Sequence, residues 1–203
     1  MQPRPPSSKL VGVVSSAPGH WSELEAQVRA SLDRGDPDEA ATRAIEHLEP
    51  DIRGYLGCRL PEDDAEDALS QFRENVWHDL GRFRWECSLR AWAYRLAHHA
   101  VTRILRQPHR RREEQLPSSA ASVLAASIGA KGPMSSERHQ GLALLRAELT
   151  DEEQELLTLR IDRELEWEEI AAILDATSAA LRKRFERLIP RLEQMARERG
   201  LIE

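Results

Sequence analysis

The residues with the most marked chemistry in this sequence are charged, and the two signs of charge are segregated along the chain. Between positions 61 and 79 the carboxylates Glu62, Asp63, Asp64, Glu66, Asp67, Glu74 and Asp79 face one basic residue, Arg73. Between positions 82 and 112 the order is reversed, and Glu86 is the one acid among Arg82, Arg84, Arg90, Arg95, Arg103, Arg106, Arg110, Arg111 and Arg112. An acidic segment followed by a basic one predicts two different partners.

Aromatic residues accompany the basic segment. Trp85, Trp92 and Tyr94 are placed to stack on exposed bases, and the arginines suit a polyanion. The alternative is that the arginines form a solvated helix face and that Trp92, which lies on an apolar stripe, packs in the core. The basic segment therefore predicts a binding site for single-stranded nucleic acid.

A second basic constellation lies near the C-terminus. Residues 165–174 are expected to form a short helix, residues 175–177 a turn, and residues 178–188 a second helix. The second helix carries Arg182, Lys183, Arg184 and Arg187. A short helix, a tight turn and a basic helix are what insertion into the major groove requires, although many helical hairpins bind no DNA.

The sequence lacks the motifs of common enzymes and metal sites. It has no phosphate-binding glycine loop, no His-Glu-x-x-His and no Gly-x-Ser-x-Gly. His98 and His99 are adjacent and diverge on a helix, as do Glu168 and Glu169. We therefore expect no catalytic residue, no metal and no cofactor.

Composition narrows the class of protein further. No apolar run approaches the roughly 20 residues of a membrane-spanning helix, so we expect a cytoplasmic protein without membrane contact. The formal net charge of -6 argues against tight DNA binding without help from another molecule. Cys58 and Cys87 are expected to be reduced, because neither has a paired-ligand spacing.

The spacing of apolar residues predicts an all-α fold of two small helical domains joined by a flexible linker. The predicted parts are a tail with a short helix over residues 1–35, a first domain over 36–107, a Ser/Ala/Gly-rich linker over 108–140 and a second domain over 141–203. Asp36 is expected to cap a helix, and Thr150 with Glu153 to form a capping box. Pro190 predicts a break in the last helix near Ile189.

The order of these motifs resembles bacterial RNA polymerase sigma factors of the extracytoplasmic-function (ECF) group. The matching residues are Asp64-Ala65-Glu66-Asp67, Gln71-Phe72 and Val76-Trp77, then Arg82-Phe83-Arg84 and Ser88-Leu89-Arg90-Ala91-Trp92-Ala93-Tyr94-Arg95-Leu96-Ala97, and finally Leu165-Glu166-Trp167-Glu168-Glu169-Ile170-Ala171 with Leu181-Arg182-Lys183-Arg184. The resemblance covers about residues 36–106 and 142–192, in the order of the family.

The resemblance implies three sets of contacts. The residues implied to bind the clamp helices of the polymerase's largest subunit are Asp64, Asp67, Gln71 and Trp77. Those implied to hold a flipped base and the strand of the minus-ten promoter element are Trp85, Glu86, Ser88, Arg95, His99, Thr102 and Arg106. Those implied to meet the minus-thirty-five element are Ser178, Arg182, Lys183, Arg184 and Arg187.

The chain also departs from the family pattern. The family usually has glycine at the position of Trp85, asparagine at that of His99 and often glycine at that of Asp175. The sequence preference at the minus-ten element therefore cannot be transferred from the family.

The expected function is that of a sigma factor, which binds core RNA polymerase at the clamp helices and flap and then recognises and melts promoter DNA. An anti-sigma factor is a further partner that the family allows, and the two domains are expected to be masked by each other or by such an inhibitor. The alternative is a stand-alone helix-turn-helix regulator whose first domain senses a ligand or dimerises. A third reading is a protein-binding adaptor. The promoter, the inducing signal, the inhibitor, the role of residues 1–35 and the oligomeric state do not follow from the sequence.

Overall fold

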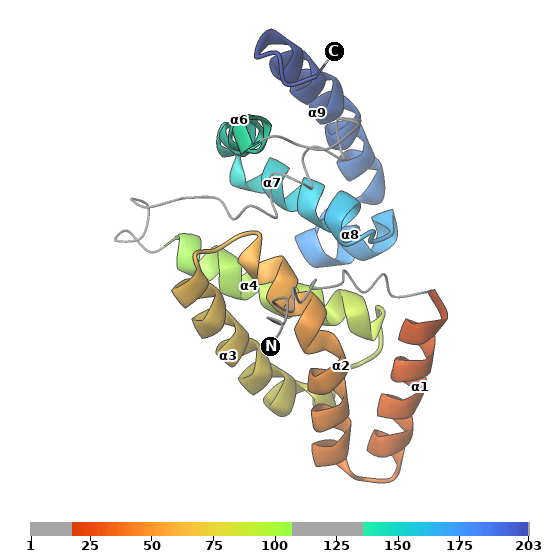
Figure 1. The fold of residues 1–203 in the computed structure, drawn as a ribbon. Coiled ribbons are helices and arrows are strands. Elements are labelled where there is room, and N and C mark those ends of the chain that lie inside the picture. The colour runs from red at the N-terminus through yellow and green to blue at the C-terminus, as the bar shows by residue number, and fades with distance from the viewer. Residues whose placement is uncertain (1–17, 107–135, 203) are drawn as a thin grey trace, which may run out of the picture.

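The computed structural model describes residues 18–106 and 136–202, and within these residues it is helical without any strand (Figure 1). The all-α prediction is therefore confirmed. The α-helices are α1 (Pro18–Asp33), α2 (Pro37–Gly57), α3 (Glu62–Asp79), α4 (Leu89–Leu105), α6 (Ser136–Ala147), α7 (Asp151–Leu157), α8 (Trp167–Leu174) and α9 (Ser178–Glu198). A short 3-10 turn, η1 (Leu80–Arg82), follows α3, and a π-helical turn, η2 (Thr158–Asp162), continues α7.

Residues 18–106, the first lobe, begin their helices at residues whose side chains can cap them. The Asp36 carboxylate accepts a hydrogen bond from the Glu39 N–H, and Pro37 occupies the first turn of α2, where its missing N–H costs nothing. The Ser88 hydroxyl accepts from the Ala91 N–H at the start of α4. The predicted cap at Asp36 is confirmed.

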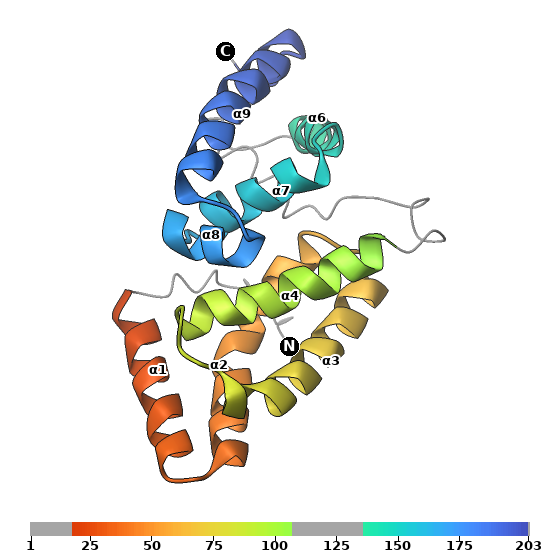
Figure 2. The same cartoon turned by 180° about the vertical axis from the view of Figure 1, so that it is seen from behind.

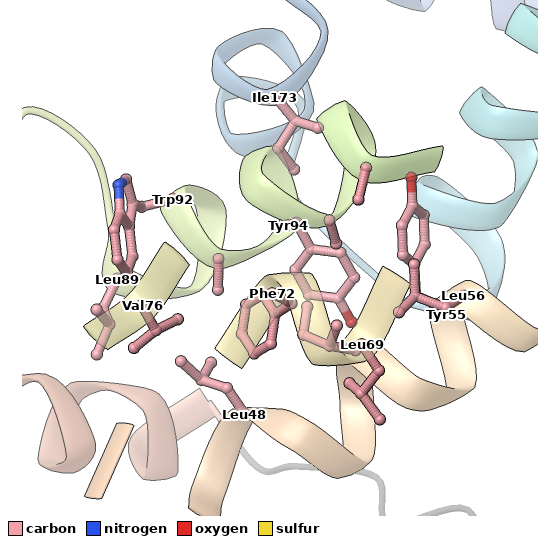
Figure 3. Packing of buried hydrophobic residues seen from close by; sticks show 14 of the residues in the cluster. Leu48, Tyr55, Leu56, Leu69, Phe72, Val76, Leu89, Trp92, Tyr94 and Ile173 are labelled. Atoms are coloured by element: carbon pink, nitrogen blue, oxygen red, sulfur yellow. The ribbon is translucent and has the colours of Figure 1, made fainter. Parts of the chain in front are cut away.

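The core of the first lobe lies between α2, α3 and α4. Figure 3 shows Leu48, Phe72 and Val76 of this core together below α4, and all three are fully buried. Helix α1 packs on α2 through Leu24 and Val28. The apolar stripes of four helices thus meet in one cluster.

Residues 136–202, the second lobe, contain a short helix, a turn and a longer helix in the predicted order. Thr150 and Glu153 form the expected capping box at the start of α7. Helices α8 and α9 are joined by residues 175–177, as predicted, and Asp175 closes α8 in the left-handed conformation with φ of 50°. A separate apolar cluster, which includes Leu142, Leu157 and Leu192, joins α6, α7 and α9.

The two lobes pack directly on each other. Helix α8 lies along α4 in both views of the chain (Figures 1 and 2), and Ile173 reaches α4 from the side opposite to Phe72 (Figure 3). The second-lobe residues Leu156, Leu159, Leu165, Ile170, Ile173 and Leu181 belong to the same apolar cluster as the first-lobe core. The division into two domains with a flexible linker stays a prediction: residues 107–135 lie outside the described part, and α6 begins at Ser136, inside the predicted linker.

The predicted break near Ile189 is wrong. Helix α9 runs from Ser178 to Glu198 with Pro190 in its interior. Leu188 and Leu192 are buried on either side of the proline, whereas Pro190 itself is exposed. The apolar stripe therefore holds the helix together across the position where a backbone donor is missing.

Candidate protein and nucleic-acid interfaces

The acidic helix α3 carries the four residues implied to bind the polymerase, and they differ in accessibility. Asp67 is exposed, and Trp77 is 47% exposed, which is unusual for a large apolar side chain. Asp64 is only 8% exposed. Gln71 is half-buried and accepts a hydrogen bond from Arg103 of α4 at 3.3 Å. Asp67 and Trp77 thus offer most of the contact surface.

The loop between η1 and α4 carries the residues implied to hold a flipped base. Trp85 is half-buried and has φ of 60°, a left-handed conformation that suits glycine. Its ring centre lies 4.7 Å from that of Phe83 and 4.0 Å from the guanidinium carbon of Arg29 in α1. Glu86 is exposed, and the Ser88 hydroxyl caps α4.

Two of the three aromatic residues that the sequence offers for base stacking lie in the core. Trp92 is buried and stacks on Phe83 with ring centres 5.0 Å apart. Tyr94 is fully buried and meets Tyr55 edge-on at 5.4 Å. Their predicted stacking role is therefore wrong, because neither ring is accessible, and the alternative that Trp92 belongs to the core is confirmed. Trp85 keeps part of its surface.

The N-terminal helix α1 supports this loop, which the sequence does not predict. The Leu89 N–H donates a hydrogen bond to the Glu25 carboxylate at 3.2 Å. The Arg90 guanidinium lies over the Trp21 ring at 4.8 Å. Periodicity predicted a helix here, but no sequence signal indicates which distant segment that helix contacts.

The remaining minus-ten candidates lie on α4, spaced as one stripe. His99 and Arg106 are exposed, whereas Arg95 and Thr102 are half-buried. Partial desolvation of the ring, followed by the nearby charges of His98 and Arg95, lowers the pKa of His99 below its ordinary value of 6.5. His99 is therefore neutral at pH 7 and can accept or donate a hydrogen bond.

Helix α9 presents its basic residues in different directions. Arg182 pairs with Glu168 at 3.2 Å and lies over the Trp167 ring at 5.9 Å. Arg184 pairs with Glu152 of α7, also at 3.2 Å. Lys183 and Arg187 are exposed, and Ser178 is half-buried at the first position of the helix. The five predicted residues thus share one helix without sharing one face.

A buried polar network joins the two lobes around Glu155 of α7, which is 2% exposed. Its carboxylate lies 2.9 Å from the Arg59 Nε and 3.2 Å from the His98 Nδ1, and the Tyr55 hydroxyl donates to it. Tyr55, Arg59 and His98 all belong to the first lobe. We call these four residues the Glu155 network.

The Glu155 network favours the ionised carboxylate. Burial by itself would raise the pKa of Glu155, but the His98 hydrogen bond and the Arg59 charge outweigh burial and lower it. Burial and the Glu155 charge raise the pKa of Tyr55 well above its ordinary value, so its hydroxyl remains a donor. Glu155 and Arg59 therefore form a charged contact inside the molecule.

Two further contacts join the lobes near the loop between η1 and α4. The Ser88 hydroxyl donates to the Glu169 carboxylate of α8 at 2.9 Å, and Arg90 donates to the Arg163 carbonyl at 2.7 Å. The first helix of the helix-turn-helix thus contacts the loop implied to hold a flipped base. The sequence predicted both elements but not that they meet.

No group of three or more His, Cys, Asp or Glu residues in the described part of the chain is arranged to hold a metal ion. No helix in the same part of the chain has the length and apolar character needed to cross a membrane. No disulfide joins Cys58 to Cys87, and the buried Cys58 thiol donates a hydrogen bond to the Asp162 carboxylate at 3.3 Å.

Comparison with known proteins gives a likeness of fold. No protein-family model matches the sequence, and no curated protein matches it. Among solved structures, the chain resembles the structure of CnrH in complex with the cytosolic domain of CnrY, with a TM-score of 0.61. The alignment covers 86% of this chain and 98% of the matched chain at 18% identity. The likeness therefore extends over both lobes, in an all-helical fold.

Proposed function

We propose that this protein is a sigma factor of the ECF group, which binds core RNA polymerase and directs promoter recognition, DNA melting and the start of transcription. The observation that carries the proposal is the exposed acidic face of α3 with Trp77 at its end, beside a loop and helix rich in arginine. A large exposed apolar residue among carboxylates is typical of a protein-docking surface and unsuited to DNA.

The proposal assigns the three candidate sets to three surfaces. Asp67 and Trp77, with Asp64 and Gln71 beside them, meet the clamp helices. The loop of Trp85, Glu86 and Ser88 holds the flipped base. The stripe on α4 follows the strand, and α9 meets the minus-thirty-five element.

The packing of the lobes fits a resting state of such a protein. The minus-ten and minus-thirty-five elements are named for positions about 25 base pairs apart, which is about 85 Å at 3.4 Å per pair. In the structure the Ser88–Glu169 hydrogen bond ties the minus-ten loop directly to the helix-turn-helix. The chain must therefore open to reach both elements, so each lobe masks the other until polymerase binds.

The likeness to CnrH supports a further partner. CnrH was solved in complex with the cytosolic domain of CnrY. We include in the proposal that a small protein domain binds this chain as an anti-sigma factor. Pull-down with the product of a neighbouring gene tests that part.

Run-off transcription tests the function directly. Purified chain is mixed with core polymerase and a promoter library, and specific transcripts that depend on the chain are expected. Failure of the chain to bind core at micromolar concentration would overturn the proposal. A gel shift without polymerase separates the stand-alone regulator, which would form a tight specific complex with duplex DNA unaided.

A further inference from the structure

The helix α1 brings one basic side chain to the rim of the minus-ten loop. Arg29 is half-exposed, with 50% of its side chain accessible, and its guanidinium lies 4.0 Å from the centre of the Trp85 ring. Phe83 lies 4.7 Å from the same centre. The Trp85 indole thus contacts both an aromatic ring of its own loop and a cation from a helix more than fifty residues earlier in the chain.

The acid next to Arg29 does not neutralise it fully. Glu25 is 3.8 Å from the Arg29 guanidinium, a long distance for an ion pair, and its carboxylate accepts the Leu89 N–H at 3.2 Å. Glu25 is therefore engaged in fixing the first residue of α4. The outward donors of Arg29 remain available to an anion.

Both signs of charge occur around the loop. Arg82 and Arg84, on either side of Phe83, are exposed. Burial raises the pKa of the Cys87 thiol, and the nearby charges that affect this pKa are that of Arg95, which lowers it, and those of Glu25, Glu86 and Glu169, which raise it. Arg29 therefore adds a cation at the edge of the loop, where a strand that places a base in the loop brings its phosphate.

We propose that Arg29 is a DNA-contacting residue of the minus-ten site: it holds the Trp85 ring by a cation–π contact and donates to a phosphate of the melted strand. This inference rests on the proposed function and adds α1 to the strand-binding surface. It also gives residues 18–33 a role, because the helix supplies both the cation and, through Glu25, the anchor of the loop.

Arg29→Ala tests the contact in holoenzyme assembled from core polymerase and the full chain. The probe is a fluorescein-labelled single-stranded 20-mer that wild-type holoenzyme has selected from a random pool. Its affinity is measured by anisotropy over a range of salt concentrations. We expect Arg29→Ala to weaken binding about fivefold and to reduce the slope of log affinity against log salt by about 0.7, the value for one phosphate contact on a single strand.

Two variants separate a DNA contact from a structural role. Arg29→Lys should keep the slope, because it keeps the charge. Arg34→Ala, in the turn that follows the same helix and in an ion pair with Glu39, should change neither the slope nor the affinity. A slope unchanged by Arg29→Ala would overturn the inference, since a residue that only supports the fold releases no counterion.

Trp85→Gly tests the coupling between the cation and the ring, and glycine suits the backbone there. In the Trp85→Gly chain, Arg29→Ala should have little further effect on affinity or slope. An equal loss with and without Trp85 would refute the coupling. If wild-type holoenzyme selects no strand and makes no transcript, the proposed function itself fails, which is a different result from an Arg29 variant that behaves like wild type.

Discussion

Three residues in the described part of the chain, Trp85, Glu164 and Asp175, occupy backbone conformations that glycine adopts at least cost. Trp85 has φ of 60° and Asp175 has φ of 50°. Left-handed backbone crowds the Cβ of an ordinary residue against the following carbonyl. At Trp85 the contacts of the indole with Phe83 and Arg29 offset this strain, whereas Asp175 is exposed and gains little in return.

Asp175→Gly is therefore expected to stabilise the fold. The free energy of unfolding should rise by about 0.5–1 kcal/mol, because glycine removes the steric cost at the C-cap of α8. Denaturant unfolding followed by circular dichroism measures it. Asp175→Ala is the control, and it should destabilise, because alanine keeps the Cβ and loses the tolerance of Asp for this conformation. Equal stabilities of the two variants would contradict the explanation.

Residues whose role depends on their immediate neighbours were predictable from the sequence. Asp36 and the pair Thr150 and Glu153 cap helices as expected, because capping involves residues three apart in the chain. Trp92 and Tyr94 were harder to interpret, because their burial depends on α2 and α3, which lie elsewhere in the chain. An aromatic residue in a basic segment has the same local pattern whether it stacks on a base or packs in a core.

At the scale of elements, α9 shows packing overriding a local preference. A proline inside a helix removes one hydrogen bond and crowds the preceding turn, at a cost of about 3 kcal/mol. The helix nevertheless continues, since Leu188 and Leu192 bury the same face on both sides of Pro190. The prediction of a break considered the proline but not the apolar stripe around it.

Pro190→Ala should remove that cost and stabilise the fold. We expect the free energy of unfolding to rise by about 1–3 kcal/mol, since alanine supplies the missing donor at an exposed position. Pro37→Ala is the matched control: Pro37 occupies the first turn of α2, where no donor is needed, and its replacement should give no gain. Thermal unfolding of the three proteins in parallel decides the matter, and a destabilised Pro190→Ala would contradict the account.

The acidic helix α3 allows docking and folding to be separated. Asp67 is exposed, so Asp67→Arg should abolish binding to core polymerase while circular dichroism and melting temperature stay close to wild type. Glu46→Arg makes the same charge change at an exposed site on α2 and should leave binding intact. Binding is measured by co-purification with core. If Asp67→Arg unfolds the chain, the residue is structural and the docking assignment is wrong.

At the scale of the whole molecule, the two lobes are joined by a buried charge. Glu155 and Tyr55 lie 100 residues apart in the sequence. Helix periodicity predicted the elements that carry them, but contacts between elements far apart in the chain leave no periodic signal. For the same reason, the contact between α1 and the loop that precedes α4 could not be predicted from the sequence.

Glu155→Gln should loosen the contact between the lobes. It removes one partner of a buried ion pair and leaves the Arg59 charge, 3% exposed, without its counter-ion, which costs about 3 kcal/mol. Small-angle scattering should show a larger radius of gyration. Glu152→Gln is the control, because Glu152 is exposed and pairs with Arg184 inside the second lobe, so its loss should cost under about 1 kcal/mol.

The same carboxylate makes the contact sensitive to acid. The pKa of Glu155 is lowered in the folded chain, so its stabilising effect is fully present above pH 4.5, the ordinary value, and is lost as pH falls through the lower folded pKa. Unfolding measured between pH 7 and pH 3 should show this loss in the wild type. In Glu155→Gln that part of the pH dependence should be missing, and an identical pH profile in the two proteins would show that Glu155 does not contribute it.

The Glu155 network also weakens the apparent binding of every ligand that needs the lobes apart. If only a fraction of molecules is open, the apparent dissociation constant is the intrinsic one divided by that fraction, so each 1.4 kcal/mol of closure weakens binding tenfold. A substitution that weakens this network would consequently lower the apparent dissociation constant of such a ligand. A screen for hyperactive alleles should therefore return positions in the interior of the molecule.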